Sequence, residues 1–182
     1  IPVTDYITSG VWQIILNPTR VVEGQYDLWL PSENVLNRGT GFLYPDEEVT
    51  LTIPSTADKV ISVGAYDALT FSYASFSGRG YTWQDERTKP DLVAPGVNVR
   101  TTAVGGGVTV VSGTSFATPF VTGASALLME WGIVRGNDPF LYGEKVKAYL
   151  RRGAKKVPEF DEYPNEEVGY GALCTAQSIP QI

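Results

Sequence analysis

The sequence predicts an α/β fold, and three features carry that prediction. From about residue 58 onward, short continuous apolar runs alternate with helical patterns, which is typical of strands buried on both faces of a parallel sheet. Residues 1–57 instead contain short β-like runs separated by Gly, Pro and Asn turns, which is typical of part of an antiparallel sandwich. A serine motif at residues 113–119 opens a long apolar helix. We therefore expect two domains, with a boundary between residues 57 and 58.

The amino-acid composition predicts a folded globular protein, and the net charge disfavours a nucleic-acid partner. The chain has 182 residues, of which 43% are hydrophobic and 19% charged, so it is long and apolar enough to bury a core. Its net charge of −6 disfavours nucleic acid, because phosphate binding needs a basic face. We interpret the basic pairs Arg151-Arg152 and Lys155-Lys156 as a solvated helix end.

The numbers of cysteine and histidine residues exclude an intrachain disulfide and the usual zinc sites. Cys174 is the single cysteine, so no intrachain disulfide can form, and we interpret it as a buried structural thiol. The chain has no histidine, and one cysteine without histidine excludes the usual zinc sites. We expect no metal and no cofactor. We find no signal peptide and no apolar run long enough for a membrane span, and we interpret the start at Ile1 as a processing site or a fragment boundary.

Four runs within residues 1–57 are predicted to be strands, because they are rich in β-branched and aromatic residues and are bounded by turn residues. They are Val11–Leu16, Tyr26–Leu30, Phe42–Tyr44 and Glu48–Ile53. We expect Trp12 and Trp29 to be largely buried in the core of a sandwich. The alternative is that these aromatic residues form a binding face.

The second part is predicted to contain a parallel sheet and two helices. Its strands are expected at Val60–Ala65, Leu92–Gly96 and Val108–Val111. A helix over residues 115–131 is apolar on every side, so we expect it at the centre of the domain. A second helix over residues 139–152 is amphipathic and belongs on the surface, and Gly153 is placed to cap it.

Ser115 stands where a predicted strand turns into the apolar helix. Free main-chain N–H groups converge at a helix N-terminus, and the helix dipole there favours negative charge. An oxyanion on an attacked carbonyl would be stabilised at this place, partly by the N–H of Ser115 itself. A structural alternative is that Ser115 is only the N-cap of the helix. A serine nucleophile also needs a base, usually an imidazole, and this chain contains none.

Four segments resemble, in the same order, the subtilisin-like serine proteases (subtilases, peptidase family S8). They are Val60–Ala65, Ala74–Gly80 with Lys89–Gly96, the serine motif Gly113–Gly123, and Gly169–Leu173. The resemblance implies that residues 58–182 are the C-terminal part of a subtilase catalytic domain. It also implies that Ser115 is the catalytic nucleophile, forms an acyl-enzyme with a protein or peptide substrate, and contributes its N–H to the oxyanion hole.

Other parts of that machinery are not found in the chain. The order Asp, His, Ser places the missing triad members upstream of Ile1, together with the family's oxyanion asparagine. Among the asparagines before residue 58, which are Asn17, Asn34 and Asn37, none stands in a matching motif. The same holds for Asp67, Asp91 and Asp161, and we expect Asp91 to satisfy backbone donors near a turn. We therefore expect the chain alone to be inactive and its partner to be the missing N-terminal part of the same protease.

Residues 1–57 resemble the tail of a jelly-roll insertion, as found in the Csp-type germination subtilases. Those proteases cleave a cortex hydrolase zymogen, so the resemblance implies an extracellular or spore-associated location. Some members have lost triad residues and act without catalysis. A pseudoprotease, or a module that binds through its β segment, is therefore the alternative function.

Overall fold

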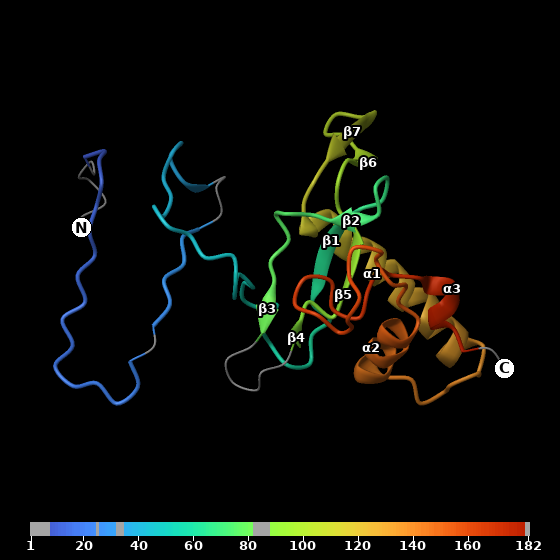
Figure 1. Ribbon diagram of the computed structural model, residues 1–182. Helices are drawn as coiled ribbons and strands as arrows, with labels where there is room; N and C mark the ends of the chain where they lie inside the picture. Colours follow the sequence, from blue (N-terminus) through green and yellow to red (C-terminus); the bar gives the residue numbers. More distant parts are fainter. Residues whose placement is uncertain (1–7, 25, 32–34, 82–87, 181–182) are drawn as a thin grey trace. The chain divides into compact units, whose positions relative to one another are not determined.

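The computed structural model describes residues 8–24, 26–31, 35–81 and 88–180 (Figure 1). Contacts divide the chain into two compact units, Ile1–Pro45 and Asp46–Ile182. This division lies upstream of the expected boundary at residues 57 and 58. Residues 46–57 belong to the second unit because they bond to it, for example through the N–H of Thr50, which donates to the Arg79 carbonyl at 2.9 Å.

The strands expected in residues 1–57 do not form in the described part of that segment. No ladder joins Val11–Leu16, Tyr26–Leu30, Phe42–Tyr44 and Glu48–Ile53. Trp12 and Trp29 are 64% and 59% exposed, so the prediction of buried tryptophans is wrong for this structure. A strand is stable only when it is paired and has one face covered, and this segment has neither. The sandwich is therefore not confirmed.

The second unit is built on a small mixed sheet. Its central strand β1 (Val63–Asp67) pairs in parallel with β5 (Leu92–Pro95) and antiparallel with the short β2 (Ser72–Tyr73). Residues near Ala172 continue the sheet beside β5. β1 and β5 are buried apolar strands, so the α/β fold with a parallel pair is confirmed.

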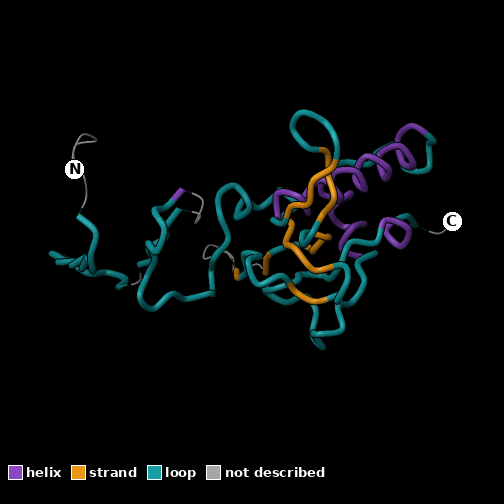
Figure 2. Tube along the Cα trace, turned by 90° about the horizontal axis from the view of Figure 1, so that it is seen from above, coloured by secondary structure: helices purple, strands orange, loops and turns teal. Residues whose placement is uncertain are grey.

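Two further strand pairs lie outside this sheet. β3 (Gly80–Tyr81) pairs with β4 (Thr88–Lys89), and β6 (Val99–Thr102) pairs antiparallel with β7 (Val108–Val111). Figure 2 shows the hairpin of β6 and β7 projecting from the unit with its glycine loop at the tip. β7 forms where it was expected, but it is a half-exposed hairpin strand rather than a buried strand of the parallel sheet. Its alternating pattern fits a strand with one solvent face.

Helix α1 (Thr114–Met129) packs against β1 and β5 (Figure 1) and continues into one π-helical turn, η2 (Glu130–Val134). It buries a single face, formed by Ala117, Val121, Ala124 and Leu128. Phe120 and Leu127 on other faces are 43% and 53% exposed, so the prediction of a helix buried on every side is wrong for this structure. Within the described residues, α1 is covered by β1, β5 and α2, and its remaining faces are exposed.

The helix formed by Thr114–Val134 is also long and apolar enough to cross a membrane by length and composition alone. This corrects the expectation that no such stretch exists. A core helix passes the same test, and here one face of the helix covers the sheet.

The last elements are α2 (Gly143–Arg152) and the short α3 (Thr175–Ser178). α2 begins at Gly143 rather than at residue 139, and it buries Val146 and Leu150 on one face, as the amphipathic pattern indicates. Gly153 follows α2 with an ordinary helical φ of −87°, and glycine is needed there because a Cβ would lie 2.3 Å from the main-chain nitrogen of Ser178. Cys174 is free and half-buried rather than fully buried.

Candidate active site

Ser115 is the second residue of α1, directly after the turn that follows β7. Gly113 is the N-cap and has a φ of 150°, a conformation that side chains with a Cβ rarely adopt. No side chain caps this helix, so Ser115 is not an N-cap serine. Its side chain is exposed and makes no hydrogen bond within the described residues.

The turn before Ser115 is anchored to the sheet by two main-chain hydrogen bonds. The N–H of Gly113 donates to the Gly96 carbonyl at 2.8 Å, and the N–H of Gly96 donates to the Tyr66 carbonyl at 3.0 Å. A Cβ at Gly96 would lie 2.5 Å from the Cβ of Ala65 and 3.4 Å from that of Ala117. The start of α1 is therefore held close against β1 and β5, and this contact fixes where Ser115 lies.

The main-chain N–H groups at this helix end are only partly used by bonds within the described residues. The N–H groups of Phe116 and Ala117 donate to the Gly113 carbonyl at 3.0 and 3.3 Å, so they are used within the first turn. The N–H groups of Thr114 and Ser115 come before the first carbonyl that a helix can offer them. They are free to donate to an anionic oxygen, and the helix dipole adds to that attraction.

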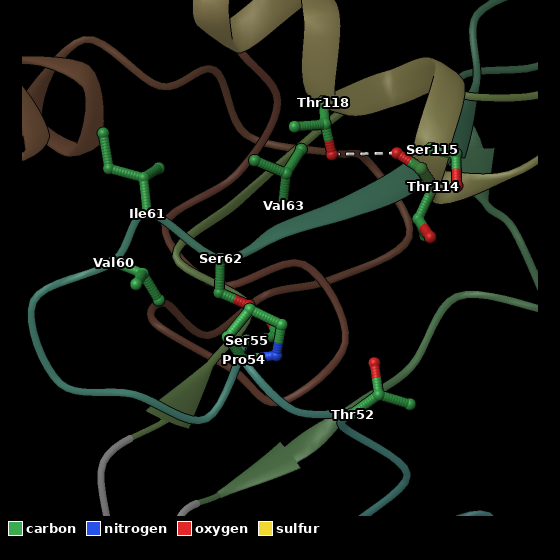
Figure 3. A pocket seen from close by; sticks show the side chains of 10 residues that line it. All are labelled: Thr52, Pro54, Ser55, Val60, Ile61, Ser62, Val63, Thr114, Ser115 and Thr118. Carbon is green, nitrogen blue, oxygen red and sulfur yellow. Dashed lines mark hydrogen bonds between the residues drawn. The ribbon is translucent and has the colours of Figure 1, made fainter.

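A cavity of about 410 Å³ lies beside Ser115 (Figure 3). One side is formed by α1, through Thr114, Ser115 and Thr118. The opposite side is formed by the segment 52–63, which we call the cavity wall, through Thr52, Pro54, Ser55, Val60, Ile61, Ser62 and Val63. Every lining side chain is uncharged, so the cavity suits an uncharged group next to the serine hydroxyl.

No lining residue can act as a base for Ser115. The chain has no histidine, and the carboxylates that the sequence brings into question lie elsewhere. Asp91 is fully buried and accepts from the Ser62 N–H at 2.6 Å, as expected of a carboxylate that satisfies backbone donors. Asp67 accepts from the Leu69 N–H at 2.8 Å in a local turn.

The remaining predicted residues do not join the cavity. Asn17 and Asn37 belong to the first unit, and Asn34 lies outside the described residues. Among the described residues, no group of three or more acidic, cysteine or histidine side chains could hold a metal. Burial raises the pKa of Tyr66 and of Tyr73, but neither side chain lines the cavity.

Sequence reasoning missed the contribution of residues 52–55 to the site. The sequence predicts a strand over Glu48–Ile53, whereas Thr52 and the two residues after that run, Pro54 and Ser55, line the cavity. The proline and the polar residues around it do indicate a turn, and that signal was present in the sequence. Nothing in their spacing indicates that the turn lies opposite Ser115, because the contact joins positions about sixty residues apart.

Comparison with known proteins agrees with this geometry. Residues 43–171 match the model of the subtilase family. Serine protease AprX of Bacillus subtilis (strain 168) is 35% identical over 156 residues, which are 75% of this chain and 33% of AprX. The human membrane-bound transcription factor site-1 protease is 44% identical over 129 residues, which are 68% of this chain and 12% of that protein.

Solved structures of proteases also resemble this chain. The Clostridium perfringens CspB protease superposes with a TM-score of 0.74 at 50% identity, over 79% of this chain and 30% of that one. The prenylagaramide maturation protease PagA has a TM-score of 0.59 at 32% identity, over 73% of this chain and 46% of that one. The chain thus spans about a third of the length of AprX and of CspB. With more than half of its residues matched, it belongs to the subtilase family of serine proteases.

Proposed function

We propose that this chain is the C-terminal, serine-bearing portion of a subtilisin-like serine endopeptidase, with Ser115 as the nucleophile. The observation that carries the proposal is the position of Ser115 at the exposed start of α1, with unpaired main-chain N–H groups beside it and a cavity in front of it. No structural hydrogen bond within the described residues occupies its hydroxyl. That arrangement is what an acyl-transfer nucleophile needs.

In the proposed reaction, the Ser115 Oγ attacks the carbonyl carbon of a peptide bond while a base takes the hydroxyl proton. The N–H of Ser115 donates to the oxyanion that forms on the carbonyl oxygen. The base then gives its proton to the leaving amine, and water hydrolyses the acyl-enzyme by the same steps in reverse. An imidazole supplied from outside these 182 residues would be the base, with an aspartate to orient it. The chain alone should therefore be inactive, and its missing N-terminal part is its first partner.

We further propose that residues 1–57 are the tail of a jelly-roll insertion and residues 58–182 the tail of the catalytic domain. The 50% identity to the CspB protease supports a Csp-type enzyme. Exposed apolar side chains in the first part, including those of Val11, Trp12 and Trp29, are suited to pairing with further strands of a sandwich. The substrate would then be a protein zymogen of a cortex hydrolase, and the enzyme extracellular or spore-associated. No observation on the chain specifically favours a pseudoprotease or a binding module.

Peptide hydrolysis by the full-length protease tests the proposed role of Ser115. We expect Ser115→Ala to reduce kcat by at least about 10³-fold, because the nucleophile is lost. Its unfolding free energy should change by less than about 0.5 kcal/mol, because the hydroxyl is exposed and makes no structural bond. Ser125→Ala, the same change further along α1, is the control and should keep full activity. Equal activity of both variants would refute the assignment.

A further inference from the structure

A cluster of buried charges lies behind the cavity wall. Asp91 is fully buried and faces three cations, which come from β4 and α2. Its carboxylate lies 3.1 Å from the Lys147 Nζ and 3.8 Å from the Lys89 Nζ, and it pairs with the Arg151 guanidinium. The Lys89 and Lys147 side chains are only 2% and 10% exposed. Lysine is rarely buried to this extent unless its charge is compensated.

The two ammonium groups compensate their burial by binding the main chain of the cavity wall. Lys89 Nζ donates to the Ala57 carbonyl at 2.9 Å. Lys147 Nζ donates to the Asp58 carbonyl at 3.2 Å and to the Val60 carbonyl at 2.9 Å. On the other side of the cluster, the Ser62 N–H donates to Asp91. Main-chain groups from residue 57 to residue 62 are therefore held by side chains distant in sequence.

Val60 and Ser62 belong both to the lining of the cavity and to the surroundings of the charged cluster. Each lines the cavity beside Ser115, and each has a main-chain group bound by the cluster. The described wall between residues 53 and 60 consists of turns and bends, without a helix or a strand to fix it. The cluster therefore supplies hydrogen bonds that regular secondary structure would otherwise provide.

Stability alone does not account for such a cluster. Taking several charges out of water is unfavourable, and replacing buried ion pairs with apolar side chains often leaves a protein equally stable or more stable. We propose that Lys147, Lys89 and Asp91 are positioning residues, which set the cavity wall opposite Ser115 and thereby tune substrate binding. The effect on substrate rests on the proposed function, whereas the effect on the wall can be measured on this chain by itself.

Lys147→Met is the variant that distinguishes an effect on the position of the cavity wall from an effect on folding of the whole unit. It removes the ammonium donor to two wall carbonyls but leaves Asp91 paired with Lys89 and Arg151, so no buried carboxylate loses all its partners. The matched control is Lys145→Met, the same change on the same helix. Lys145 donates to Asp138 at 2.7 Å and is not among the groups bound to the wall. Lys147→Arg restores a cationic donor and should recover most of the wild-type behaviour.

Hydrogen exchange on the 182-residue chain provides the first measurement. We expect Lys147→Met to speed exchange of the Ala57 and Ser62 amides, which donate to the Pro54 carbonyl and to Asp91, by about tenfold. The reason is that the wall opens more often once its carbonyls lose the Lys147 ammonium. Amides of α1 at residues 117–128 should exchange as in the wild type, which shows that the unit stays folded. Equal exchange of the wall amides in Lys147→Met and Lys145→Met would overturn the proposal. Should Lys147→Met fail to fold, Lys89→Met, which removes the donor to the Ala57 carbonyl, permits the same comparison.

Kinetics of the full-length protease provide the second measurement. We expect Lys147→Met to raise KM for a peptide several-fold while kcat and the labelling of Ser115 by a small fluorophosphonate change less than about twofold. An unchanged KM, or an equal loss of kcat and labelling, would overturn the positioning role. If the wild-type enzyme itself is not labelled at Ser115, the proposed function fails instead, and the exchange experiment then decides the effect on the wall.

Discussion

Two glycines determine where Ser115 lies. Gly113 adopts a φ that favours glycine, and Gly96 brings the main chain of β5 and the start of α1 within touching distance. The hydrogen bond between their main chains joins the sheet to the serine turn. The position of Ser115 therefore depends on the absence of a side chain at both glycines.

Adding a methyl group at Gly96 tests this dependence. We expect Gly96→Ala to lower the unfolding free energy by about 1–3 kcal/mol, because its Cβ would lie 2.5 Å from the Cβ of Ala65 and 3.2 Å from the Gly113 carbonyl oxygen. Urea denaturation of the chain measures the change. Gly123→Ala in α1 is the control, since no atom lies within 4 Å of the new Cβ, and it should stabilise by about 0.5–1 kcal/mol. Equal midpoints for the two variants would contradict the close contact.

The sequence predicted features that depend on neighbouring residues. It did not predict contacts between side chains that are distant in the sequence. The serine motif predicted the turn and the helix start, because both depend on neighbouring residues. Arg151 was interpreted as part of a solvated helix end, but it pairs with Asp91 and lies 4.8 Å from the centre of the Tyr170 ring. Arg152, Lys155 and Lys156 are exposed as expected. Nothing in a local charge pattern shows which member of a basic pair meets a buried acid sixty residues away.

Elements with continuous apolar patterns were predicted best. β5 and α1 lie within one or two residues of their expected starts, because their buried faces are defined by their own residues. β1 begins at Val63 rather than Val60. The residues before it are held in the cavity wall by Lys89 and Lys147, which no apolar pattern indicates. β7 was placed correctly along the chain but in the wrong sheet, since a short run of valines fits either environment.

Glu166, in the loop after α2, has a raised pKa, which predicts a pH dependence of stability. Burial, followed by the hydrogen bond and repulsion from Glu48, raises the pKa of Glu166 above its usual value of 4.5. Glu167 adds repulsion, and Arg79 opposes the shift. The folded state therefore holds the Glu166 proton more tightly than the unfolded state does. Its stabilisation is complete below pH 4.5 and is lost as the pH rises through the folded-state pKa.

Glu166→Gln should remove this loss, because the amide stays neutral at every pH. We expect the variant to be more stable than the wild type at pH 7 and similar to it at pH 4, as measured by urea midpoints across that range. Glu162→Gln is the control, because Glu162 is exposed in the same loop. A wild-type pH dependence retained in Glu166→Gln would show that the loss arises from another group.

The largest difference between sequence and structure concerns the first unit. Its apolar and aromatic pattern indicates strands, but the described residues form no ladder, and Trp12 and Trp29 remain exposed. A pattern of apolar residues identifies the face that a strand can bury, and it does not supply the partner strand. α1 also has an apolar face without a covering partner in the described residues, because Phe120 and Leu127 are exposed on it. Both surfaces expose apolar side chains within the described residues.

Labelling with a fluorophosphonate, followed by mass-spectrometric mapping of the adduct, tests the nucleophile most directly. The full-length protease should carry the adduct on Ser115, and the 182-residue chain should carry none at a comparable rate, because it contains no histidine to accept the proton. An adduct on another residue of the full-length enzyme would contradict the assignment of Ser115. Labelling of the isolated chain at the full-length rate would contradict the claim that its base comes from elsewhere.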